Sequence, residues 1–204
     1  MSSTSSPTYK DGADASHRLR LWSIGHSIHS YDDFIDLLRS ARISAVADVR
    51  SRPYSGYNPH FNRDRIQAEL ESNQIRYVYL GTELGAYREG SELETDATDD
   101  FQTISSSQLF QKGLDRLLEG ARKYRLAMMC GEKDPMTCHR THLIERALRT
   151  RAPEISVDHL EADGTIETKA QFESRLMRTN GVDEEDLFMT RDELVTEAYR
   201  RSAL

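Results

Sequence analysis

Short apolar runs and helix-like apolar stripes alternate along most of the chain. Runs of strand length occur at residues 19–24, 43–49, 75–80, 124–130 and 155–160. Between them, apolar residues recur three and four positions apart, as in Phe34, Leu37, Leu38 and Ala41, which predicts helices with one buried side. This order predicts an α/β fold in a single domain: a mostly parallel β-sheet with helices on both faces, a Rossmann-like three-layer sandwich.

Capping and turn residues mark the ends of some of these elements. Ser30 with Asp33 resembles a capping box and predicts a helix start, and the serines and glutamine of residues 105–108 predict a second one. The Asp-Gly pair at 163–164 signals a tight turn. That turn makes residues 165–168 a candidate hairpin partner of the fifth strand.

The two ends of the chain and one internal stretch differ from the rest in composition. Residues 1–18 are rich in Ser, Asp and Gly without periodicity, which predicts a disordered leader. Residues 19–180 carry the α/β pattern, and residues 181–204 predict an acidic C-terminal helical extension. The acidic stretch 89–100 favours a solvated, mobile insertion, with a lid over a site as the alternative.

Composition narrows the classes of protein that fit. Hydrophobic residues make up 37% of 204 residues, which is enough for one domain with a real core. No apolar run approaches the roughly 20 residues that span a bilayer, and the start lacks a secretory pattern. We therefore expect no membrane partner and a cytoplasmic location with reduced cysteines. The net charge of −7 argues against indiscriminate binding of nucleic acid but allows a local basic pocket.

Polar and reactive side chains follow four of the predicted strands at their carboxyl ends. In chain order they are His26 and Ser27, Asp48 and Arg50, Glu83 and Gly85, and Cys130 and Glu132. Parallel sheets of this kind bind ligands at the carboxyl ends of their strands. We therefore expect these side chains to converge on one rim.

The two cysteines occupy different predicted positions. Cys130 ends a strand, where a buried and inert thiol is the common alternative to a reactive one. Cys138 opens a predicted helix beside Arg140, and both the helix start and the arginine would lower a thiol pKa. Cys138 is thus the stronger candidate nucleophile, or one half of a redox pair with Cys130. The same helix start and Arg140 would also bind an anion such as phosphate.

Several familiar signatures are absent. Cys130 and Cys138 lie too far apart for a C-x-x-C redox motif, and the chain has no glycine-rich dinucleotide or P-loop motif. Arg140 also lies further from Cys130 than the corresponding arginine of cysteine phosphatases and rhodaneses. A metal is a separate alternative, because Cys130, Cys138, His139 and His26 offer ligands suited to Zn²⁺ or iron. Their spacing matches no zinc signature, so the sequence assigns no metal ligand and no cofactor.

Five short motifs together resemble the domain of unknown function 488 family. They are Gly25-His26-Ser27, Asp48-Val49-Arg50 with Pro53 and Ser55, Leu84-Gly85, Cys130-x-Glu132, and Cys138-His139-Arg140. The resemblance runs from about Trp22 to about Gly164. The family usually has a second glycine after Leu-Gly, where this chain has Ala86. The resemblance implies a small, soluble α/β protein with the motif residues at the strand ends, and it implies no particular reaction.

Two sets of residues carry the functional hypotheses. The reactive set, for nucleophilic, redox or proton chemistry, comprises Cys130, Glu132, Cys138, His139, Asp48 and His26. The substrate-binding set comprises Arg50, Arg52, Ser27, Pro53, Ser55, Tyr54, Glu83, Gly85 and Arg140. In the alternative interpretation, Asp48 and Arg50 form a purely structural ion pair.

Three classes of function remain open from the sequence. The leading hypothesis is an enzyme that acts on a nucleotide, a nucleic acid or another anionic substrate through a cysteine and arginine site. The second is a non-catalytic module that binds nucleic acid or a phosphorylated ligand. The third is a metal-binding protein that uses Cys and His. The expected partner is an anionic small molecule or nucleic acid, and the sequence does not define the oligomeric state.

Overall fold

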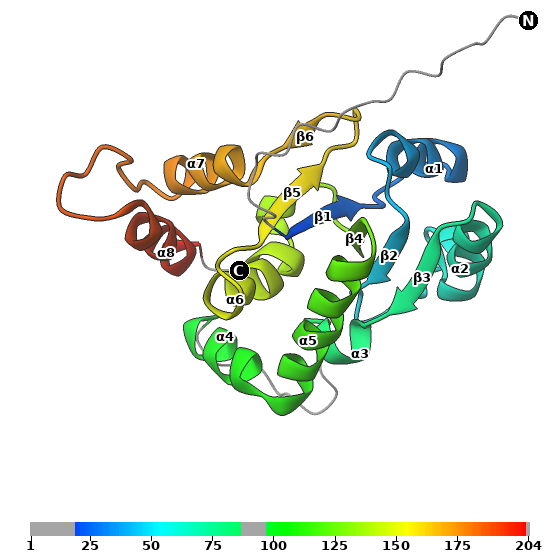
Figure 1. Ribbon diagram of the computed structural model, residues 1–204, viewed down its shortest axis with the longest axis horizontal. Coiled ribbons are helices and arrows are strands. Elements are labelled where there is room, and N and C mark those ends of the chain that lie inside the picture. Colours follow the sequence, from blue (N-terminus) through cyan, green and yellow to red (C-terminus); the bar gives the residue numbers. More distant parts are fainter. Residues whose placement is uncertain (1–18, 87–96, 203–204) are drawn as a thin grey trace, which may run out of the picture.

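A six-stranded sheet forms the centre of the described part of the chain, which in this computed structural model comprises residues 19–86 and 97–202 (Figure 1). The predicted leader, 1–18, and most of the predicted insertion, 89–100, lie outside these residues. The strands are β1 Arg20–Gly25, β2 Ala45–Asp48, β3 Arg76–Tyr79, β4 Leu126–Cys130, β5 Ser156–Leu160 and β6 Ile166–Glu167. Their spatial order is β3-β2-β4-β1-β5-β6. All pair in parallel except β6, so the predicted α/β fold with a mostly parallel sheet is confirmed.

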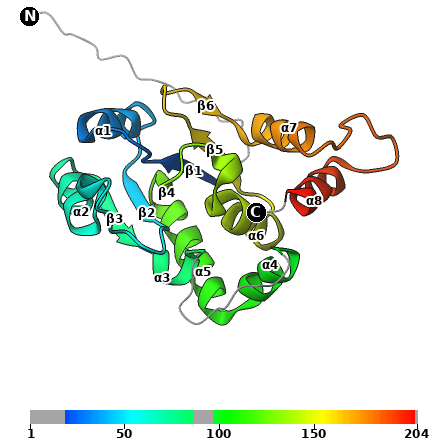
Figure 2. The ribbon, with the colours of Figure 1, turned by 180° about the vertical axis from the view of Figure 1, so that it is seen from behind.

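Helices cover both faces of this sheet (Figures 1 and 2). The α-helices are α1 Tyr31–Ser40, α2 Arg63–Ser72, α3 Gly81–Leu84, α4 Ala97–Ser106, α5 Gln108–Lys123, α6 Arg146–Arg151, α7 Lys169–Thr179 and α8 Arg191–Arg201. Two 3₁₀-helices, η1 Pro59–Phe61 and η2 Pro135–Thr137, and a π-helix, η3 Arg140–Glu145, lie in the connections. No helix in the described ranges is long and apolar enough to cross a membrane.

Two apolar cores lie on opposite faces of the sheet. Side chains of β4 point alternately into one core and the other, so every one of them is buried. Leu126, Met128 and Cys130 point toward the core shared with α5 and α6. Ala127 and Met129 point toward the core shared with α1 and α2. A strand buried on both faces has no need of polar alternation, which explains its continuous apolar run.

Helix starts follow the predicted capping residues in one case and depart from them in another. The Ser30 side chain accepts a hydrogen bond from the Asp33 N–H and caps α1, as predicted. The predicted cap within 105–108 is displaced: Ser105 lies inside α4, and Ser107 caps α5. Residues 97–100, the last part of the predicted mobile insertion, instead form the first turn of α4. The helical region therefore begins upstream of the start that the sequence predicts.

The carboxyl-terminal part of the described chain packs as a helical pair. Phe172 and Leu176 of α7 bury their side chains with Val195 and Tyr199 of α8. The hairpin predicted before α7 is confirmed, since β6 runs antiparallel to β5 after a turn in which Gly164 has a φ of +85°.

The connection from β4 to η2 crosses directly over the end of β1. The N–H groups of His26 and Ser27 donate to the carbonyl oxygens of Cys130 and Gly131, at 2.9 and 3.0 Å, and so continue the pairing of β1 and β4 beyond the strands. The Glu132 carbonyl oxygen lies so close to Gly25 that a Cβ there would overlap it. Gly25 therefore determines how closely the two ends approach.

Gly25→Ala should destabilise the protein because neither backbone at this crossing has room to move. We expect a loss of about 2–3 kcal/mol in unfolding free energy, as for overpacking of a closed contact. Gly56→Ala is the matched control, since a Cβ at Gly56 meets nothing within 4 Å, and it should change stability by less than about 1 kcal/mol. Urea unfolding measures both variants, and equal midpoints would contradict the tight crossing.

Candidate functional site

A pocket of about 450 Å³ opens at the carboxyl ends of β1, β2 and β4, which are neighbours in the sheet. Its walls come from the residues after each of these strands and from the loop before η1. The lining residues are His26, Arg50, Ser51, Arg52, Ser55, Asn58, Ala86, Cys130, Gly131, Glu132 and His139. The structure therefore brings together seven of the residues selected from the sequence: His26, Arg50, Arg52, Ser55, Cys130, Glu132 and His139.

Asp48 anchors Arg50 below this pocket instead of lining it. Asp48 is fully buried and accepts hydrogen bonds from Nε and Nη2 of Arg50, at 2.9 and 2.6 Å. The Tyr77 hydroxyl donates to the same carboxylate at 2.8 Å. With these donors in place, Asp48 holds the guanidinium in a fixed position, and the ion pair considered from the sequence is present.

His26 is a neutral ring that is fixed on both nitrogens. It stacks on Phe61 with ring centroids 4.3 Å apart. Arg50 Nη1 donates to Nε2 at 3.2 Å, because an arginine has only donors, and Nδ1–H then donates to the Ser27 carbonyl oxygen at 3.1 Å. Burial, followed by the charge of Arg50, lowers the pKa of His26 to about 4. His26 therefore positions Arg50 at neutral pH.

One carboxylate oxygen links the two cysteines. Cys130 Sγ and Cys138 Sγ both donate to Oε2 of Glu132, at 2.9 and 3.0 Å. Burial alone would raise the pKa of Glu132, but the hydrogen bonds from the two thiols outweigh it and lower the pKa to about 2. The carboxylate is therefore ionised at neutral pH. Nδ1 of His139 lies 3.5 Å from Cys130 Sγ and 3.9 Å from Cys138 Sγ.

The prediction of a lowered pKa for Cys138 is wrong. Hydrogen bonding to Cys130 and burial raise the pKa of Cys138 well above its usual range. Both cysteines are buried, Cys138 at 1% and Cys130 at 2% exposed, and only Cys130 is among the residues that line the pocket. The helix that was expected to start at Cys138 is the π-helix η3, which starts at Arg140.

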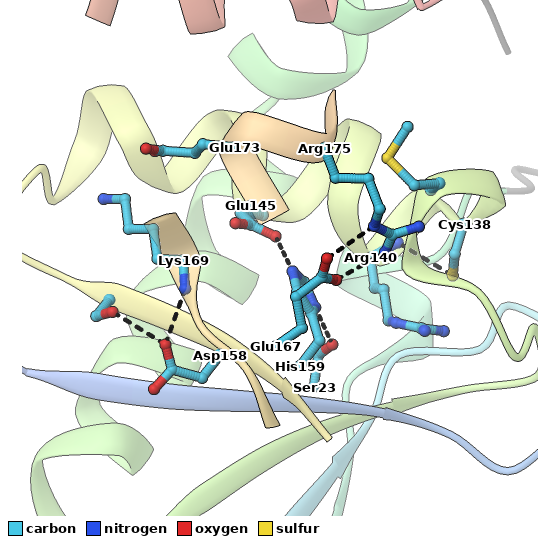
Figure 3. Close-up of polar contacts among 12 residues, drawn as sticks. Ser23, Cys138, Arg140, Glu145, Asp158, His159, Glu167, Lys169, Glu173 and Arg175 are labelled. Atoms are coloured by element: carbon cyan, nitrogen blue, oxygen red, sulfur yellow. Dashed lines mark hydrogen bonds and ion pairs between the residues drawn. The ribbon is translucent and has the colours of Figure 1, made fainter. Parts of the chain in front are cut away.

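Arg140 lies beside Cys138 (Figure 3) and is not among the residues that line the pocket. Its Nη1 and Nη2 donate to the carbonyl oxygens of Glu132 and Lys133, at 2.7 and 3.0 Å, and its N–H donates to Cys138 Sγ at 3.4 Å. The side chain is 1% exposed. The expected substrate contact is thus replaced by a structural one, because the loop carbonyls face the guanidinium.

A second polar group lies buried beyond Arg140 (Figure 3). His159 Nδ1 is 2.7 Å from the Ser23 hydroxyl, and its Nε2 is 3.4 Å from a Glu145 carboxyl oxygen. Burial lowers the pKa of His159 to about 3 and raises that of Glu145 to about 8, so both side chains are uncharged at neutral pH. This layer supports η3 without contributing a charge to the pocket.

The remaining predicted substrate residues divide between rim and framework. Ser27 has a φ of +45°, and its carbonyl oxygen accepts from Asn58 Nδ2 at 3.0 Å, which ties the two rim loops together. Pro53 is buried, and its carbonyl oxygen accepts the N–H of Arg63 at 2.9 Å. Tyr54 is exposed at the surface and bonds to Asp64, outside the pocket lining.

The third strand end differs most from expectation. Glu83 pairs with Arg116 of α5 and does not line the pocket. Gly85 allows a close approach, since a Cβ there would lie 2.5 Å from the Ser51 hydroxyl oxygen. The next residue, Ala86, replaces the second glycine of the family pattern and lines the pocket.

Sequence reasoning missed Tyr77, Phe61 and Asn58. The Tyr77 hydroxyl donates to Asp48, the Phe61 ring stacks on His26, and Asn58 lines the pocket. In the sequence these three residues stand out only as aromatic or amide side chains near a motif. The residues that they contact belong to other strands and loops, so their roles can be recognised only once the order of the strands in the sheet is known.

Four side chains of the described residues can hold a metal ion together. Cys130, Glu132, Cys138 and His139 place their donor atoms within 4.8 Å of one another. The sequence analysis named His26 as the possible fourth metal ligand, but the ring nitrogens of His26 bond to Arg50 and Ser27. Glu132 takes that place.

Fold and site define a parallel α/β protein with a pocket of cysteine, glutamate and histidine at its strand ends. Residues 30–147 match the family described as Domain of unknown function DUF488, and this chain belongs to that family. The match covers more than half of the 204 residues and begins after the Gly25-His26-Ser27 motif. Searches of curated proteins and of solved structures give no match.

His26 should make the protein less stable in acid. Its folded-state pKa of about 4 lies below the ordinary value of 6.5, so its contribution is complete above pH 6.5 and is lost as the pH falls through 4. Compared with His26→Gln, the wild type should lose about 2–3 kcal/mol more between pH 7 and pH 4. Urea unfolding at several pH values measures this difference, and parallel curves for the two proteins would rule it out.

Proposed function

We propose that this protein is an enzyme that acts on a small anionic molecule bound in the pocket. The reaction centre is the group formed by Cys130, Glu132 and His139. The observation that carries the proposal is their convergence with Arg50 and Arg52 on one pocket, although these residues come from distant parts of the chain. Pockets that combine a few polar groups with perturbed pKa values are the usual places of catalysis.

The arginine side of the pocket supports the choice of an anion. Arg50 is oriented by Asp48 and His26, and Arg52 lines the pocket from the exposed loop that follows. Guanidinium groups bind phosphate and carboxylate oxygens through paired hydrogen bonds. Ser55 and Asn58 add neutral polar groups on the same wall. A phosphorylated small molecule such as a nucleotide fits this combination, despite the overall charge of −7.

The opposite wall supports chemistry on the bound molecule. Glu132 is ionised and lines the pocket, so its carboxylate can accept a hydrogen bond from a bound molecule or stabilise positive charge that develops there. His139 directs Nδ1 toward both sulfur atoms, because its Nε2–H donates to the Val49 carbonyl oxygen at 3.0 Å. Cys130 presents its sulfur between these two groups.

Arg52→Ala should weaken binding of inorganic phosphate and nucleoside monophosphates by at least about 10-fold, since one guanidinium contact is lost. Arg65→Ala is the matched control, because Arg65 is an exposed arginine of the adjacent helix α2 that does not line the pocket. Thermal-shift titration of both variants measures the effect.

Equal affinity in wild type and Arg52→Ala would overturn the anion site. A protein that ignores these ligands but binds single-stranded oligonucleotides, with affinity that falls steeply as salt rises, would instead be the non-catalytic binding module. The exposed Tyr54 and Tyr57, which are 56% and 91% accessible, are the observation in favour of that second candidate.

Cys130 should react with iodoacetamide at least about 10-fold faster than Cys138 in chelator-treated folded protein. Both cysteines are buried, but only Cys130 lines the pocket through which a reagent can enter, and the raised pKa of Cys138 reduces its thiolate fraction. Peptide mass spectrometry after timed alkylation gives both rates. Faster labelling of Cys138 would remove Cys130 from its place as the sulfur that faces the substrate.

A further inference from the structure

The two cysteines, Glu132 and His139 come from three short connected segments that the fold holds in fixed positions. Cys130 is the last residue of β4, Glu132 lies in the loop over Gly25, and Cys138 and His139 stand between η2 and η3. Their donor atoms are two sulfurs, one carboxylate oxygen and one imidazole nitrogen, all within 4.8 Å of one another. This is the donor set that zinc and other borderline-soft divalent metals prefer.

The sulfur–nitrogen distances fit a tetrahedral ion, and the sulfur–oxygen distances require an outward shift of the carboxylate. With metal–sulfur bonds near 2.3 Å and metal–nitrogen bonds near 2.0 Å, sulfur and nitrogen ligands lie about 3.5 Å apart. The two sulfur–nitrogen distances to His139 are 3.5 and 3.9 Å. The two sulfur–oxygen distances to Glu132 are shorter, at 2.9 and 3.0 Å, because thiol protons bridge them. Loss of those protons to solvent would let the carboxylate move outward by about half an ångström to a ligand position.

The surrounding hydrogen bonds orient two of the donors as metal ligands require. His139 donates Nε2–H to the Val49 carbonyl oxygen at 3.0 Å, which turns Nδ1 toward the sulfurs, the position from which it would bind a metal after losing any proton. The N–H of Arg140 points at Cys138 Sγ from 3.4 Å, as expected for a group that stabilises a thiolate. Arg140 also holds the backbone that carries Glu132.

We propose that Cys130, Cys138 and His139 bind a Zn²⁺ ion, with Glu132 as the fourth ligand on the pocket side. The inference rests on the proposed function only in naming the cofactor of that same site. Glu132 is the exposed member of the four, whereas both cysteines are buried. It is therefore the ligand that water or a bound anion can displace, which leaves three protein ligands and one open position, as in catalytic zinc sites.

The test uses the full chain, purified without a histidine tag, stripped with a chelator and titrated with Zn²⁺ alone. Calorimetry should give one ion per chain. Cys138→Ser should weaken zinc binding at least about 100-fold, and Glu132→Gln about 10-fold. Asp134→Asn is the matched control for Glu132→Gln, because Asp134 lies in the same loop and bonds to Met136 N and Arg175 outside the group.

Two measurements on the unmodified protein keep the test decisive if a cysteine variant fails to fold. One equivalent of Zn²⁺ should raise the melting temperature and slow alkylation of both cysteines at least about 10-fold. Absence of one-to-one binding, or unprotected cysteines at saturating zinc, overturns the inference. Zinc binding without any effect of Arg52→Ala on anions would refute the proposed function alone. Anion binding by a protein that ignores zinc would refute the metal site alone.

Discussion

The position of β4 between β1 and β2 is the constraint on which the site depends. The chain forms β1, passes over to β2 and β3, and returns through α5 to fill the gap with β4. Three parallel strand ends thereby become neighbours, although Gly25, Asp48 and Cys130 are far apart in sequence. The close crossing of the loop after β4 over Gly25 then fixes the position of Glu132 relative to His26. Without that crossing, the carboxylate would not meet both thiols.

Two arginines stabilise opposite sides of the pocket by different means. Arg50 is neutralised by Asp48 and points its remaining donors toward His26 and the pocket, so one charge is compensated below the surface. Arg140 bonds to backbone carbonyl oxygens and to a thiol, and stands at the first residue of a π-helix. Single π-helical turns are rare and frequently accompany functional sites. Here His139 immediately precedes the π-helix, its ring is oriented by the Val49 carbonyl oxygen, and Arg140 remains buried.

Much of the fold and part of the site could be predicted because local patterns report backbone direction and burial. The apolar run ending at Cys130 identified a strand, and the carboxyl-end rule placed Cys130 and Arg50 on one rim. The same rule failed for Glu83, since the short helix α3 turns that side chain toward Arg116. The prediction of a lowered pKa for Cys138 is wrong for a different reason. Arg140 does favour the thiolate, but the hydrogen bond to Cys130 and burial outweigh it, and the sequence did not reveal that Cys130 lies beside Cys138.

The charges of the proposed metal ligands and of the two arginines that line the pocket can balance one another. With zinc bound, two thiolates, one carboxylate and a neutral imidazole would carry three negative charges, which the divalent ion would reduce to one. Glu132 would be the ligand at the pocket surface, so its displacement would leave a neutral metal site facing the cavity. Arg50 and Arg52 line the same pocket, and an anion bound there would pair with their positive charges. Without a metal, the negative charge of the same carboxylate is stabilised by hydrogen bonds from the two thiols. Protons and a metal ion would therefore compete for one position.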